Sequence, residues 1–134
     1  MHPNFTLPAL LAGLATLLLF CTPGANHCPD INGRWSNREG QIFSFDPGGK
    51  GLWLVKFGSK YGTFPIAYRY DCGKKTTTLD LSDFKTGPMA GKTQYGIIEW
   101  SGDTLFRMSS ETGSSEASRP QKFDPEHVDK FYRE

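Results

Sequence analysis

The residues best suited to chemistry in this chain are few, and they lie near its ends and turns. Cys28 and Cys72 form an even pair once an N-terminal segment that holds Cys21 is set aside, and beyond that segment the histidines are His27 and His127. Two cysteines in an exported chain are better explained as a disulfide than as nucleophiles. A bridge around so long a loop would stabilise the fold by about 3–4 kcal/mol. The alternative is two free thiols.

Motifs of the common enzyme and cofactor sites do not occur in the sequence. It holds no G-x-S-x-G nucleophile elbow, no P-loop, no glycine-rich dinucleotide motif after a strand and no H-E-x-x-H. Asp103, in "SGDT", is typical of a turn. We therefore predict a non-enzymatic protein with no catalytic residues and no cofactor. An enzyme is the third hypothesis, and it would require titratable groups that converge in a cleft.

One metal hypothesis depends on processing of the N-terminus. Cleavage after Gly24 would leave Ala25, Asn26 and His27 as the first three residues. Their amine, two amide nitrogens and imidazole could bind Cu(II) or Ni(II) in a square plane. Cleavage after Ala25 would destroy this set. An incidental histidine beside a disulfide is the simpler interpretation, so no metal site is predicted.

The N-terminal segment has the pattern of a secretory signal. Residues 7–20, "LPALLAGLATLLLF", form an uncharged apolar run followed by small and turn-forming residues. The run is shorter than the roughly 20 residues that span a bilayer. We predict a signal peptide over 1–24, a single domain over 25–134 and a periplasmic or extracellular location, without membrane insertion after cleavage. The alternatives are an N-terminal anchor and lipidation at Cys21.

The remaining sequence alternates apolar and polar residues at the period of a β-strand. After a first strand that starts at Gly33, the expected strands are 41–45, 51–57, 64–70, 76–81, 94–100, 104–109 and 116–123. About eight short strands at regular spacing predict an all-β, antiparallel up-and-down barrel or a sandwich, and closure of a barrel removes exposed edges. Asp124, Pro125 and Glu126 are typical of a helix start, so a short C-terminal helix is expected over 123–134.

An eight-stranded barrel can hold one small ligand or be filled by its own side chains. The strand pattern points eight candidates for a ligand cavity inward: Phe43, Phe45, Trp53, Val55, Tyr68, Tyr70, Ile97 and Leu105. The simpler interpretation is that these residues are core.

Four segments carry a resemblance to a known family. They are "GRW" at 33–35, "KKTTTLDL" at 74–81, "YGIIEWSGDTL" at 95–105 and "RPQKF" at 119–123. The first resembles the opening motif of lipocalins, and together they resemble small bacterial exported lipocalin-like domains of unknown function.

The resemblance implies a lipocalin-like barrel whose first strand begins at Gly33. It also implies that Trp35 closes one end of the barrel, packed by an arginine from a late strand. Arg119 is the first candidate for that arginine and Arg107 the second. An arginine that stacks on the indole contributes around 1–2 kcal/mol when partly desolvated.

The charge and composition of the chain limit the classes of molecule that it is expected to bind. The 134-residue chain has a net charge of +1, which predicts no bulk attraction to nucleic acid or to anionic membranes. The leading hypothesis is a monomeric binding module for a small apolar or amphipathic ligand. The alternative is an envelope protein-interaction domain with a filled barrel, whose partner would meet basic residues near the turns: Lys56, Arg69, Lys74, Lys75 and Lys92.

Overall fold

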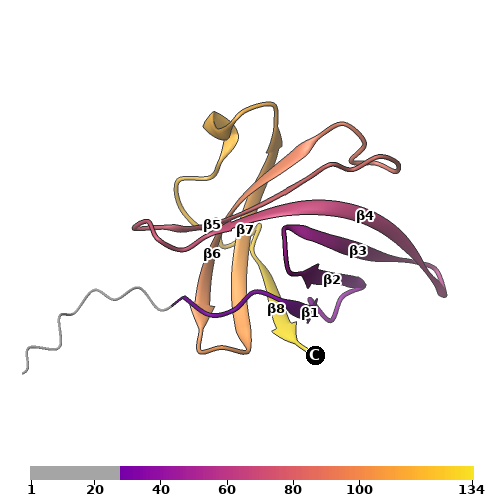
Figure 1. Cartoon of the computed structure of the whole chain (residues 1–134), viewed down its shortest axis with the longest axis horizontal. Coiled ribbons are helices and arrows are strands. Elements are labelled where there is room, and N and C mark those ends of the chain that lie inside the picture. The colour runs from indigo at the N-terminus through magenta and orange to yellow at the C-terminus, as the bar shows by residue number, and fades with distance from the viewer. Residues whose placement is uncertain (1–27) are drawn as a thin grey trace, which may run out of the picture.

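The barrel closes by pairing its last strand with its first. The computed structural model describes residues 28–134, in which each strand pairs antiparallel with its sequence neighbours and β8 also pairs with β1 (Figure 1). The strands are β1 (Gly33–Ser36), β2 (Gln41–Asp46), β3 (Lys50–Phe57), β4 (Lys60–Asp71), β5 (Thr77–Ser82), β6 (Thr93–Ser101), β7 (Leu105–Gly113) and β8 (Asp129–Arg133). The prediction of an all-β antiparallel barrel of eight strands is confirmed.

Alternation along the strands explains why the barrel forms. In β5, Leu79 and Leu81 are completely buried on the inner face, while Asp80 between them points to the outer face. In β2, Phe43 and Phe45 point inward in the same way. Successive side chains of a strand point to opposite faces, so this alternation fixes which face each strand turns toward the core.

The core is continuous and rich in aromatic rings. Twelve buried residues form it: Ile31, Trp35, Phe43, Phe45, Ile66, Leu79, Leu81, Phe84, Ile98, Phe106, Met108 and Phe131. Two of them come from outside the strands. Ile31 belongs to the segment that precedes β1, and Phe84 to the loop that follows β5. Ile31 lies beside Trp35, whose indole donates to its backbone oxygen, and the ring of Phe84 lies 5.6 Å from that of Trp53.

The predicted C-terminal helix is wrong. Asp124 does begin a turn, since its backbone oxygen accepts the N–H of His127 at 3.0 Å, but the chain then extends into β8. A strand places Phe131 in the core, 5.3 Å from the ring of Phe106, and covers the free edges of β1 and β7. Closing two edges stabilises the barrel more than one face of a short helix would.

The expected strand over 116–123 is also wrong, because its first residues form a single 3₁₀ turn, η1 (Glu116–Ser118). Pro120 interrupts the segment soon afterwards, and proline cannot donate to a strand ladder. No helix within residues 28–134 has the length and apolar character needed to cross a membrane.

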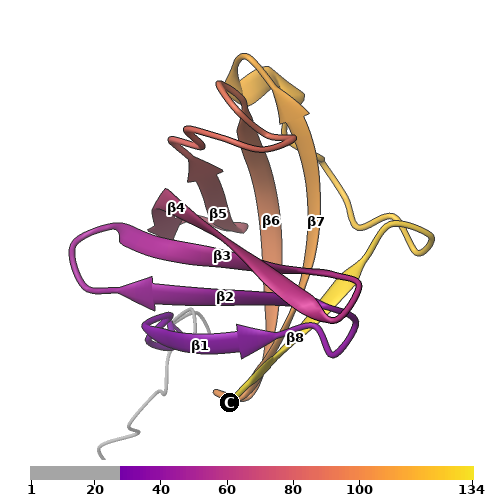
Figure 2. The same ribbon diagram turned by 90° about the vertical axis from the view of Figure 1, so that its right-hand side faces the viewer.

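β3 and β4 form a hairpin that extends beyond the rest of the barrel. β2 lies beside β3 (Figure 2) and accompanies it only as far as the pair Gln41–Val55, and β5 accompanies β4 only from Ala67 onward. Only the tip of the hairpin, where Lys56 pairs with Tyr61 and Phe57 with Lys60, is therefore two-stranded, and Figure 1 shows the β3–β4 turn at the right-hand end of the molecule.

Candidate functional site

Trp35 closes one end of the barrel. Its side chain is completely buried, and its indole Nε1–H donates to the backbone oxygen of Ile31 at 2.8 Å. The rings of Trp100 and Phe106 lie 5.3 and 5.0 Å from it, in the edge-on and tilted arrangements that aromatic quadrupoles favour. The only polar atom of this large side chain is thus satisfied inside the core.

The arginine that covers Trp35 is Arg133 of β8, not Arg119 or Arg107. Its guanidinium lies 4.3 Å from the centroid of the indole. It also donates to the backbone oxygens of Asp30 at 2.7 Å, Asn32 at 3.0 Å and Asp103 at 3.1 Å. Arg133 therefore ties the segment before β1 to the β6–β7 turn over the ring.

Gly33 makes room for this arrangement. Its φ of +121° lies in the region that side chains other than glycine rarely adopt. A Cβ built on it would also lie 3.2 Å from Nη1 of Arg133. The glycine two residues before the tryptophan is therefore required by the backbone and by the arginine.

Arg119 has a different partner. Its Nη1 and Nη2 donate to the two carboxylate oxygens of Asp80 at 2.5 and 2.8 Å, and Nη1 also donates to the backbone oxygen of Gly96 at 2.8 Å. The hydrogen bonds that Arg119 donates to Asp80 raise the pKa of Arg119 above its ordinary value. This pair fastens the segment after η1 to the outer face of β5 and β6. Arg107 instead pairs with Glu99 at 3.0 Å on the outer surface.

The predicted disulfide between Cys28 and Cys72 is present and anchors the N-terminal segment across the same end. Nearby, the Tyr70 hydroxyl donates to the backbone oxygen of Pro29 at 2.9 Å and accepts from Nε1–H of Trp100 at 3.1 Å. Burial raises the pKa of Tyr70 above its ordinary value. Residues 25–27, which carry the copper-binding hypothesis, lie outside the described residues.

Four of the eight side chains predicted to line a cavity pack against one another. Phe43 lies 5.5 Å from Phe45 and 6.5 Å from Trp53, with nearly parallel rings. Phe45 lies 4.7 Å from Tyr68. These contacts fill the space between β2, β3 and β4.

Two of the eight candidates do not point into the core. Ile97 is buried but lies outside the core cluster, and Leu105 is half-buried. Their neighbours Ile98 and Phe106 occupy the core instead. This is an error of one residue in register, and both members of each pair are apolar, so alternation could not separate them. Val55 shares the inner face of β3 with Trp53 and is half-buried.

A cleft of about 300 Å³ lies on the outside of the barrel, where β5 begins. β5 pairs with β6 only as far as Ile98, so Glu99, Trp100 and Ser101 have a strand partner on the β7 side alone. The cleft lies beside this edge, and its lining residues are Lys75, Thr76, Thr77, Ile98, Glu99, Trp100 and Phe123.

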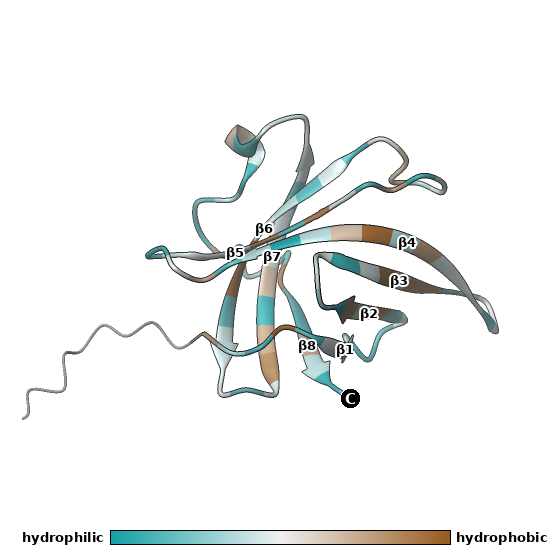
Figure 3. Ribbon diagram, viewed as in Figure 1, coloured by the Kyte–Doolittle hydropathy of each residue, from teal (hydrophilic) through white to brown (hydrophobic). Residues whose placement is uncertain are grey.

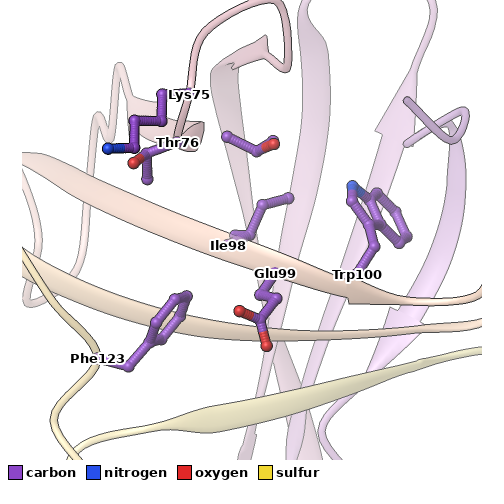
Figure 4. A pocket seen from close by; sticks show the side chains of 7 residues that line it. Lys75, Thr76, Ile98, Glu99, Trp100 and Phe123 are labelled. Atoms are coloured by element: carbon purple, nitrogen blue, oxygen red, sulfur yellow. The ribbon is translucent and has the colours of Figure 1, made fainter. Parts of the chain in front are cut away.

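The cleft has an apolar part and a charged end. Figure 4 shows Lys75 and Thr76 on one side, and Phe123 with Glu99 on the other. The Glu99 carboxylate accepts from Nε of Arg107 at 3.0 Å, and the Arg107 guanidinium lies 4.0 Å from the centroid of Phe123. Arg107 therefore fixes both residues at one wall, while Lys75 is exposed at the other.

Sequence reasoning missed Arg133 and Phe123 as site residues. Arg133 follows Phe131 at the period of a strand, and that spacing would have indicated it if 129–133 had been read as a strand. Phe123 stands in "RPQKF" without strand or helix periodicity, and no local signal places it beside β6.

Among residues 28–134, no three His, Cys, Asp or Glu side chains gather in a group that could hold a metal ion. In comparisons with known proteins, no family model, no curated protein and no solved structure matches this chain.

Proposed function

We propose that this chain is a non-enzymatic, exported binding module that takes a small amphipathic molecule in the cleft beside β6, not inside the barrel. One observation carries the proposal. The aromatic side chains expected to line an interior cavity pack on one another, whereas the cleft beside the edge of β6 is open. Its volume lies at the lower end of the range for small-ligand sites, about 300–1,000 Å³.

The lining residues favour a ligand with a short apolar chain and an anionic group. Trp100 and Phe123, which are half-buried, offer apolar surface to the chain. Lys75 offers an ammonium group, and the negative charge of Glu99 on the opposite wall is balanced by Arg107. A carboxylate beside Lys75 would gain a charge-assisted hydrogen bond.

The compartment and assembly belong to the same proposal. The Cys28–Cys72 disulfide is consistent with an oxidising compartment, the periplasm or the cell exterior. We propose a monomer related to the small lipocalin-like domains that the sequence resembles, and the closed eight-stranded barrel fits that relationship.

Isothermal titration of the disulfide-bonded protein with octanoate, and separately with 1-octanol, tests the proposal. We expect saturable binding of octanoate and weaker binding of octanol. Lys75→Glu should weaken octanoate binding at least tenfold, and Phe123→Ala should weaken both ligands. Lys122→Glu is the matched control, because Lys122 is an exposed lysine next to Phe123 that does not line the cleft. Octanoate binding that survives both cleft variants would contradict the proposal.

The alternative is an envelope protein-interaction domain, which would share the packed barrel. If neither octanoate nor octanol binds, that interpretation is favoured over a small-molecule module.

A further inference from the structure

The β3–β4 hairpin concentrates exposed apolar side chains. Within residues 28–134, the large hydrophobic residues that are exposed are Leu52, Phe57 and Tyr61, at 37%, 55% and 48% of their full accessible area. All three belong to β3 or β4, and Phe57 and Tyr61 flank the turn. Figure 3 shows hydrophobic colour along both strands. Leu52 lies farther along β3, where that strand pairs with both β2 and β4, so Phe57 and Tyr61 are the exposed apolar residues of the tip, and exposed apolar side chains of this kind indicate an interaction surface.

Apart from Asp71, the last residue of β4, the same hairpin carries only positive charge. No Asp or Glu occurs between Asp46 and Asp71, a stretch that contains Lys50, Lys56, Lys60 and Arg69. Four cations and no acid give this stretch a charge of +4. The whole chain has 15 Lys and Arg against 14 Asp and Glu, a net charge of +1. The net charge of the whole chain is therefore close to zero although residues 47–70 are strongly basic.

Around the tip, neighbouring elements do not cancel this charge, whereas Arg69 at the base of the hairpin lines a cleft with Asp71, Asp80 and Glu116. The β1–β2 turn brings Arg38 and Glu39 to a cleft of about 500 Å³ that Lys56 and Tyr61 also line, so one acid there faces two cations. Beyond β5, Asp83 is paired with Lys85 at 2.6 Å. A lower pKa for Asp83 follows chiefly from its hydrogen bond with Lys85, and Lys50 contributes to it.

We propose that the tip of this hairpin docks on the surface of an anionic phospholipid bilayer. Phe57 and Tyr61 would enter the interfacial region, which aromatic side chains favour, while Lys56 and Lys60 contact lipid phosphates. The β3–β4 turn lies at one end of the molecule, where a flat surface could reach it (Figure 1). The inference concerns a different surface from the cleft beside β6 and does not depend on the function proposed for that cleft.

A second copy of the chain fits this surface less well. Along residues 60–66, the edge of β4 that faces away from β3 has no strand partner, but Pro65 stands in this segment and has no N–H to donate. Two basic hairpin tips, each carrying Lys56 and Lys60, would also repel each other. Proline and lysine at an edge are the features that oppose strand addition.

Sedimentation with vesicles tests the proposal. The exported, disulfide-bonded protein is mixed with vesicles of phosphatidylglycerol and phosphatidylcholine in equal parts, and with pure phosphatidylcholine vesicles. Three double variants are compared with the wild type: Phe57→Ser with Tyr61→Ser, Lys56→Glu with Lys60→Glu, and the control Lys122→Glu with Lys130→Glu. The control changes net charge equally through exposed lysines outside the hairpin. Any contribution of residues 1–27 is the same in every sample.

We expect the wild type to bind the phosphatidylglycerol vesicles and to lose most of that binding near 1 M salt, where the Debye length is about 3 Å. Each hairpin double variant should reduce the partition coefficient at least about tenfold, and the control should reduce it less than threefold. Thermal unfolding establishes that every variant is folded. Three results would each overturn the proposal: no wild-type binding to the anionic vesicles, equal binding to phosphatidylcholine, or an equal loss in the control.

Discussion

The two ends of the barrel use aromatic side chains in opposite ways. At the end crossed by residues 28–32, Trp35 is completely buried, has its N–H satisfied and is covered by Arg133. At the other end, Phe57 beside the β3–β4 turn is 55% exposed, and its nearest ring partner is Phe64 at 6.5 Å. The first arrangement stabilises the fold, whereas the second leaves apolar surface available to a partner.

The difference arises from covalent and polar anchoring. The first end has a disulfide, the buried Ile31 and three backbone oxygens that accept from Arg133. Within residues 28–134, the tip of the hairpin has no third strand beside it, and one backbone hydrogen bond, from Lys56 N–H to the Gly40 oxygen at 2.8 Å, joins it to the β1–β2 turn. An isolated two-stranded ribbon is only marginally stable by itself, so the hairpin depends on the barrel.

The largest expected effect on stability comes from replacing one aromatic residue at each end of the barrel. Trp35→Ala should lower the free energy of unfolding by about 3–5 kcal/mol, because it opens a cavity in the core. Phe57→Ala should lower it by about 1 kcal/mol or less, since most of that ring is already in water. Urea denaturation of the two variants measures both values. Similar losses would show that the two ends are equally important for stability.

Removal of the disulfide should have the next largest effect. Cys28 and Cys72 are 44 residues apart in sequence, and a loop of that length corresponds to about 4 kcal/mol in the chain-entropy model. Cys28→Ser combined with Cys72→Ser should therefore shift the urea midpoint strongly to lower concentration. If oxidised and reduced wild-type protein unfold at the same urea concentration, the anchoring argument fails.

The two arginines can be distinguished by their partners. Arg119→Met leaves the Asp80 carboxylate largely buried without its cation, and should cost about 3 kcal/mol, with part recovered when Asp80→Leu is added. Arg133→Met should instead move the NMR resonance of the Trp35 indole N–H, which Arg119→Met should leave in place. A shift of that resonance in Arg119→Met alone would restore Arg119 as the closing arginine.

The smallest expected effect concerns the turn before β8. His127 Nδ1 lies 2.7 Å from a carboxylate oxygen of Asp124, and this hydrogen bond raises the pKa of His127. The pair therefore stabilises the turn below the ordinary pKa of histidine, and this contribution is lost as the pH rises through the raised pKa. NMR titration should show a lower pKa for His127 in Asp124→Asn. An unchanged pKa would contradict the assignment.

Several features of the fold could be predicted from local sequence, and others could not. Leu79, Asp80 and Leu81 alternate clearly, so their strand and its faces were predictable. Ile97 and Ile98 are both apolar, and only pairing with β5 and β7 decides that Ile98 faces the core. In residues 123–134, Asp124 begins a single turn and not a helix, because closure of the barrel favours a strand over Asp129–Arg133.

The candidate sites, too, were only partly predictable from local sequence. Aromatic residues at strand spacing indicated an interior face, but packing distances decided that these rings contact one another. The cleft beside β6 joins Lys75 to Phe123, which are far apart in the chain, so no local pattern could indicate it.

By itself, the sequence determined the all-β class, the antiparallel order of the strands and the Cys28–Cys72 pair, which follow from local alternation, turn residues and composition. The burial of Trp35 was expected from the resemblance to lipocalins. Only the tertiary structure decided which arginine covers Trp35, where the chain closes the barrel and which surfaces stay open. These depend on contacts between residues about 100 positions apart, such as Asn32 with Arg133, and such contacts form only when the whole barrel is assembled.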